Sequence, residues 1–163
     1  TDHAPARRRK GAGAVAPPYP NPNKGPPMPI NSRKIYLCGP IMDEHEGHAR
    51  AWRELAKRRL QSSFTLLDPM RRNFKDREVD SANEIVEFDL QDIRNADILL
   101  VNYSKPSIGT AMEVFYAANN LQKFVVAFAP FDFKNCSPWM VRYCTKILPS
   151  LDAAVDYIKA HFS

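Results

Sequence analysis

The sequence predicts an α/β domain built on a parallel sheet, preceded by an extension that lacks a core of its own. Short, continuously apolar segments alternate with longer segments in which apolar side chains recur at spacings of three and four. Uninterrupted apolar strands are typical of a parallel sheet covered by helices on both faces. The basic and proline-rich character is confined to residues 1–33, so the folded domain is expected at 34–163.

The first half of the domain predicts two strands and two helices. Residues 34–38 are apolar and stop at Gly39-Pro40, which indicates a buried strand followed by a turn. Residues 46–60 have the spacing of an amphipathic helix, and residues 64–67 resemble a second strand. Ser81 and Glu84 form a capping-box signature, which predicts a helix from there to about residue 95.

The second half continues the alternation. Apolar runs at 97–101 and 123–129 predict the third and fourth strands, and 145–148 is a weaker fifth. Thr110 and Glu113 form another capping box, which predicts a helix over 110–120. Ser150 is expected to cap a final helix that ends near residue 161.

Five strands in a domain of this length fit a doubly wound, flavodoxin-like sheet with the order 2-1-3-4-5. In such a sheet, ligands bind where the strand order reverses, at the carboxyl ends of strands one and three. The expected site therefore lies at residues 36–42 and 104–113. Neither loop contains G-x-G-x-x-G or Gly-Lys-Ser/Thr, so the sequence supports no nicotinamide cofactor and no Walker loop, and we expect no cofactor.

Charge and proline content set the extension apart. Residues 1–33 hold six basic side chains, one acidic side chain and eight of the 14 prolines, whereas 34–163 is electrically neutral. We expect this segment to be extended, and either disordered or bound to a partner. The basic run at 7–10 is interpreted either as a solvated tail or as a contact with an acidic protein or RNA.

Composition also excludes several classes of protein. No apolar run approaches the length of a membrane span. Cys38, Cys136 and Cys144 are odd in number and form no CxxC pair, which favours a reducing compartment over a disulfide framework. We expect a cytoplasmic protein; the alternative is a mitochondrion or another organelle after removal of a presequence. His45 and His48 lack a third ligand, so we interpret them as surface residues and expect no metal.

Glu113 has two interpretations from the residues alone. As a capping-box member it would bond back to the Thr110 amide; as a carboxylate at the switch point it would act as nucleophile or base. Asp89 and Asp92 share a helix face, which solvation alone would explain. At about 1.5 Å per residue, Asp89 lies roughly 12 Å from the start of its helix, so reaching the cleft is expected to need a later start or a bend.

Four segments in order resemble the nucleoside 2-deoxyribosyltransferase family, and the resemblance runs from about residue 34 to 158. They are Lys34–Pro40, Asp68–Arg72, Asp89–Asp97 and Lys105–Glu113. The resemblance implies exchange of the base of a 2′-deoxyribonucleoside through a covalent deoxyribosyl-enzyme. It further implies that Glu113 is the nucleophile, that Tyr36 orients its carboxylate, and that Asp89 contacts and helps to protonate the base.

Other residues are expected to bind or specify the substrate, a nucleoside or nucleotide together with a free base. They are Gly39, Arg71, Asp92, Ser107, Gly109 and Met112. Ser107 stands where some family members carry an aspartate for the sugar 5′-OH, a change that would admit a 5′-phosphate served by Arg71 and Arg72. The related deoxynucleoside 5′-monophosphate N-glycosidases look similar there. Acidic residues at 43, 44 and 46 favour the nucleoside over the nucleotide.

The resemblance also implies a homo-oligomer whose sites are completed by residues 135–145 of a neighbouring subunit. A different hypothesis, motivated by the tail, is a family member that serves as a subunit of a larger, possibly organellar, assembly. Trp52 and Met112 are expected in the core, and Cys38 is expected to be a packed thiol without a redox role.

Overall fold

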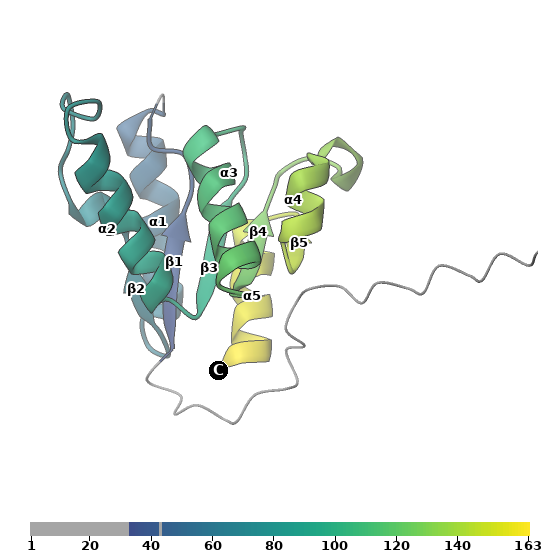
Figure 1. Ribbon diagram of the computed structural model, residues 1–163. Helices are drawn as coiled ribbons and strands as arrows, with labels where there is room; N and C mark the ends of the chain where they lie inside the picture. Colours follow the sequence, from purple (N-terminus) through teal and green to yellow (C-terminus); the bar gives the residue numbers. More distant parts are fainter. Residues whose placement is uncertain (1–32, 43) are drawn as a thin grey trace, which may run out of the picture.

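The computed structural model describes residues 33–42 and 44–163, so the expectations for residues 1–32 and for Asp43 lie outside the described residues. It contains the predicted parallel sheet in the order β2-β1-β3-β4-β5 (Figure 1). The strands are β1 (Lys34–Cys38), β2 (Thr65–Leu67), β3 (Ile98–Asn102), β4 (Phe124–Phe128) and β5 (Lys146–Leu148). The fold class and the strand order are thereby confirmed.

Strand β1 is central because it pairs with β2 on one side and β3 on the other. Tyr36 lies opposite Leu67 and Leu99, and Cys38 lies opposite Val101. Tyr36 is therefore held in register by hydrogen-bonded strands on both sides, and Cys38 by β3. Since successive side chains of a strand point to opposite faces, Tyr36 and Cys38 share one face of the sheet.

Helices cover both faces of the sheet (Figure 1). Helices α1 (Glu46–Leu60) and α5 (Leu151–Phe162) pack on the face of Ile35 and Leu37. The opposite face, with Tyr36 and Cys38, is covered by α2 (Ala82–Asn95), α3 (Ile108–Phe115) and α4 (Pro138–Tyr143). Each face thus has its own hydrophobic core.

The helix at the expected site begins earlier than its capping box predicts. Ser107 caps α3 by accepting the Thr110 amide at 3.4 Å, and the helix continues beyond Phe115 as a wider π-helical turn over Tyr116–Asn120. Glu113 is consequently in the second turn of α3, and the Thr110 amide that it would have capped is bonded to Ser107 instead. The capping interpretation of Glu113 is wrong.

Three smaller expectations are also corrected. Helix α2 starts where predicted, but Ser81 makes no side-chain capping bond. Met112, expected in the core, is 68% exposed on α3. The sequence analysis predicted no helix at 138–143. The structure has α4 there, with Ser137 as its N-cap and Pro138 in its first turn. Trp52 is partly buried against the core of α1 and α5, as expected.

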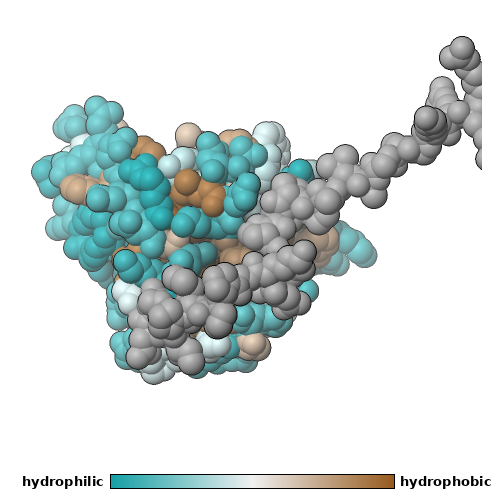
Figure 2. Space-filling model, turned by 60° about the horizontal axis from the view of Figure 1, so that its bottom comes forward, coloured by the Kyte–Doolittle hydropathy of each residue, from teal (hydrophilic) through white to brown (hydrophobic). Residues whose placement is uncertain are grey.

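Figure 2 shows polar residues dominating the face on view, interrupted by hydrophobic areas. Among residues 33–42 and 44–163, no helix combines the length and the apolar character needed to cross a bilayer.

Candidate active site on the β1–α3 face of the sheet

Glu113 meets two donors from β1. Its Oε1 accepts a hydrogen bond from the Tyr36 hydroxyl at 2.8 Å, and its Oε2 lies 2.9 Å from the Cys38 sulfur. Both oxygens of the carboxylate are thereby engaged by side chains that alternate along a single strand. The predicted pairing of Tyr36 with Glu113 is present, and the Cys38 contact is an addition that sequence reasoning missed.

Asp89 joins this group from α2. Its carboxyl interacts with the Tyr36 hydroxyl, and its charge acts on Glu113. Helix α2 begins at Ala82 and runs to Asn95, so the later start, one of the two alternatives expected from the rise per residue, is wrong. Tyr36 lies two residues before the end of β1, so the site reaches down the face of the sheet to the middle of α2.

Burial raises the pKa of both carboxyls. The pKa of Glu113 rises to about 7 because burial disfavours the charged form, and the nearby charge of Asp89 adds to this. Bonds from Cys38 and Tyr36 oppose the rise. The pKa of Asp89 rises to about 6, again chiefly through burial, and the charge of Arg72 opposes it. Near neutral pH, the pair is therefore poised to hold a single proton.

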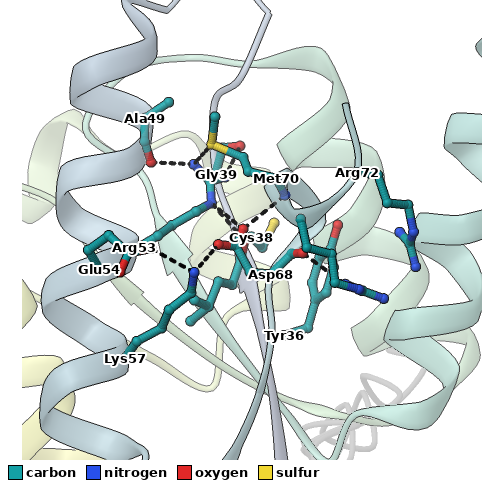
Figure 3. Close-up of polar contacts among 12 residues, drawn as sticks. Tyr36, Cys38, Gly39, Ala49, Arg53, Glu54, Lys57, Asp68, Met70 and Arg72 are labelled. Atoms are coloured by element: carbon teal, nitrogen blue, oxygen red, sulfur yellow. Dashed lines mark hydrogen bonds and ion pairs between the residues drawn. The ribbon is translucent and has the colours of Figure 1, made fainter. Parts of the chain in front are cut away.

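A buried arginine supports β1 from the other face. Arg53 of α1 is fully buried and donates to the carbonyls of Ala49 at 2.7 Å and Gly39 at 2.9 Å (Figure 3). Its Nε lies 3.6 Å from Asp68, which also pairs with Lys57 at 2.5 Å. Burial lowers the pKa of Arg53, and the charge of Asp68 counteracts this. The network fixes the backbone where β1 ends.

Gly39 follows directly, and its backbone is closely surrounded. A Cβ placed there would lie 2.9 Å from the Trp52 ring and 3.0 Å from the Asn102 Cβ. Only a glycine fits this approach without displacement. Gly109, in contrast, has open space around it at the start of α3.

The two arginines considered for a phosphate are engaged by Asp92. Arg71 donates to Asp92 at 2.7 Å and Arg72 at 2.9 Å, while Arg72 also lies 3.6 Å from Asp89. Asp92 is buried, and a buried charge is costly unless it is paired. The two guanidinium groups supply that pairing. Arg72 in turn stacks on Phe88.

The remaining predicted substrate residues lie around the start of α3. Ser107 lines a hollow of about 360 Å³ between α3 and α4, together with Thr110, Trp139 and Tyr143. Neither Tyr36 nor Glu113 is among the residues that line this hollow. Met112 is exposed on the same helix.

The two histidines near the first loop are on the surface. His45 and His48 are exposed, and His45 caps α1 through its ring nitrogen. Within the described residues, no group of three metal-ligating side chains converges. Glu44 pairs with Lys105 at 3.1 Å, which balances part of the negative charge at this loop.

Two carboxyls of different pKa, one held by a phenol, suit cleavage of a glycosidic bond. One ionised carboxylate can stabilise or attack an anomeric carbon, and a second, protonated carboxyl can neutralise the departing group. Tyr36 contacts both carboxyls, so it links the two roles.

A family model and several solved structures are similar to this chain. Residues 35–144 match the family model described as nucleoside 2-deoxyribosyltransferase. A 2-deoxyribosyltransferase from Bacillus psychrosaccharolyticus is similar in structure, with a TM-score of 0.62 and 21% identity over 76% of this chain and 91% of that one. The CMP N-glycosidase BcmB of Clostridium botulinum has a TM-score of 0.55 and 12% identity, covering 80% of this chain and 100% of its own. Among curated proteins, none matches the chain.

Proposed function

The chain belongs to the nucleoside 2-deoxyribosyltransferase family, and from this premise we propose that it cleaves the N-glycosidic bond of 2′-deoxyribonucleosides and transfers the deoxyribose to another base. The observation that carries the proposal is Glu113, held by Tyr36 at 2.8 Å beside the second carboxyl of Asp89. No nicotinamide, metal or other cofactor enters this chemistry.

The reaction proceeds in two displacements. The reactive form of the pair carries its one proton on Asp89 and leaves Glu113 ionised; it is the minor form, because the pKa of Glu113 is the higher of the two. In this form Glu113 attacks C1′ as the bond to the base breaks, and Asp89 delivers a proton to the base nitrogen that receives the bonding electrons. The acceptor base then attacks C1′ of the glycosyl-enzyme, which releases the Glu113 carboxylate, and its proton returns to Asp89. Tyr36 binds Glu113 Oε1 throughout, so it orients the carboxylate without exchanging a proton.

The test is an exchange assay with a covalent readout. Wild-type protein mixed with a deoxynucleoside and a second free base should form the new deoxynucleoside, and intact mass should show a deoxyribosyl adduct when no acceptor is present. Glu113→Gln should lose both signals. Glu87→Gln, at an exposed glutamate of α2, is the matched control and should retain them. Exchange that survives Glu113→Gln would refute the assignment of the nucleophile.

A second candidate is hydrolysis of 2′-deoxynucleoside 5′-monophosphates. It is favoured by Ser107, which places a neutral hydroxyl at the amino end of α3 where backbone amides favour an anion. The pairing of Arg71 and Arg72 with Asp92 favours the nucleoside, because neither guanidinium is left to a phosphate alone. Release of free base from monophosphates, but not from nucleosides, would select the hydrolase.

We also propose that the chain forms a homo-oligomer through α3 and α4. Ile108, Met112 and Phe115 are exposed along one side of α3, and Phe115 contacts the exposed Trp139 of α4 with ring centroids 6.2 Å apart. An apolar stripe of this kind is typical of an interface. Such an assembly would bring residues 135–145 to a neighbouring site. Trp139→Ser should lower the mass measured by light scattering, whereas Val79→Ser, at another exposed apolar residue, should not.

The tail keeps its own hypothesis, because it lies outside the described residues. A non-catalytic role in a larger assembly predicts that deletion of residues 1–30 abolishes co-purification with a partner while the domain stays folded. An acidic protein or RNA is the expected partner. Unchanged co-purification would contradict this role, and transfer activity in the exchange assay would show that the domain is a catalyst.

A further inference from the structure

Cys38 occupies a position that the proposed reaction has not yet used. Its side chain is fully buried, and its sulfur lies 2.9 Å from Glu113 Oε2 and 4.0 Å from the Thr110 carbonyl. The other buried thiol of the same core, Cys144, has no comparable contact with Glu113 among the described residues. Cys38 is thus distinguished by a contact with the carboxylate.

The thiol acts here as a hydrogen-bond donor. Burial raises the pKa of Cys38 well above its ordinary value, and the charge of Glu113 raises it further. Cys38 therefore keeps its proton while Glu113 is ionised, and an ionised carboxylate can only accept. The S–H of Cys38 donates to Oε2 just as the O–H of Tyr36 donates to Oε1.

We propose that Cys38 is a positioning residue, which, together with Tyr36, holds the Glu113 carboxylate in its ionised form and in one orientation. This inference rests on the proposed function. Two donors on alternate residues of β1 fix the plane of the carboxylate, because each oxygen is held from the same strand. A thiol is a weak donor, so Oε2 is held more loosely than Oε1 and is the oxygen more easily released for attack.

Three other titratable or charged groups act on the pKa of Glu113 from the elements around it. Tyr36 comes from β1, Asp89 raises the pKa of Glu113 from α2, and Arg53 lowers it from α1. Loss of the Cys38 donor leaves these groups in place. The pKa of Glu113 should then rise in Cys38→Ala by up to about one unit, the effect of one hydrogen bond to a charged group.

The kinetic consequence depends on pH. Below the pKa of Glu113, Cys38→Ala should show kcat/KM lowered by up to about tenfold, because fewer molecules carry an ionised carboxylate. Above the raised pKa of Glu113 in the variant, the two enzymes should converge. A merely structural defect would lower activity at every pH. Cys38→Ser retains a donor and should keep most of the activity at low pH.

The decisive measurement is the pKa of Glu113 itself, followed by NMR of carboxyl-labelled glutamate, with Glu113→Gln to assign the signal. We expect the pKa of Glu113 to be higher than in wild type in Cys38→Ala and close to the wild-type value in Cys38→Ser. It should not change in Cys144→Ala, the matched buried-thiol control. An equal pKa in wild type and Cys38→Ala would overturn the proposal. If Cys38→Ala does not fold, an unchanged pKa in Cys38→Val, which removes the donor while filling the space, would overturn it equally.

This measurement needs no turnover, so it separates the two claims. A shifted pKa in a protein that exchanges no base would uphold the contact and refute the proposed function. An unshifted pKa in an active enzyme would refute the role of Cys38 alone.

Discussion

Replacing Arg53 by methionine should be the most destabilising single change that we can name in α1. The substitution keeps an unbranched apolar side chain but removes the guanidinium that serves the carbonyls of Ala49 and Gly39. It also leaves Asp68, which is itself buried, with Lys57 as its one cationic partner among the described residues. Breaking a buried ion pair by removing one member costs about 3–5 kcal/mol.

We expect the lower end of that range, about 3 kcal/mol, because Lys57 remains to balance Asp68. For a domain of this size, each kcal/mol lowers Tm by a few degrees, so the melting temperature should fall by about 10 °C. Arg50→Met is the matched control one turn away. Arg50 is half exposed and pairs with Glu46 at 2.9 Å, so its loss should cost about 0.5 kcal/mol or less.

The assay is urea unfolding followed by circular dichroism, with m-values compared to confirm that the same transition is measured. A loss below about 1 kcal/mol for Arg53→Met, or one equal to that of Arg50→Met, would refute the reasoning. The double variant Arg53→Met/Asp68→Asn adds a further check. Because it also removes the Asp68 charge that Arg53 no longer helps to balance, its total loss should be smaller than the sum of the two single losses.

Three further predictions concern the site. Plotted against pH, kcat/KM should be bell-shaped with its maximum between the pKa values of about 6 for Asp89 and about 7 for Glu113, because one proton on the pair is required; an activity that keeps rising to pH 9 would contradict this. Tyr36→Phe should lower kcat/KM at pH 6 by about tenfold or more and by less at pH 8, since a hydrogen bond to the ionised form is lost. Gly39→Ala should cost about 1–3 kcal/mol in urea unfolding, as expected for overpacking, and Gly109→Ala less than about 1 kcal/mol; equal effects would contradict the close approach at Gly39.

Most of the fold is predictable from the sequence because its strands are uninterrupted apolar runs. Segments such as 34–38 and 97–101 have no alternating polar residues, and this pattern fits a sheet covered on both faces. Helix α4 escaped prediction because six residues are too few to show a helical period, and only Ser137-Pro138 marked its start.

The site was less predictable, since local and tertiary interactions compete for the same side chain. Glu113 fitted a capping box with Thr110, yet the actual cap is Ser107, and this releases Glu113 to Tyr36. No local signal in the sequence indicates that Arg53 is buried against Asp68, because the two residues meet only in the folded domain.

The hydrogen bond between Tyr36 and Glu113 spans 77 positions along the chain. Neither β1 nor α3 alone, nor any fragment that lacks one of them, can assemble the carboxylate in its working environment. During refolding, catalysis should therefore return last, with the slowest phase of native packing and never with early helix formation. The time course of regained turnover would therefore report when the native state is complete.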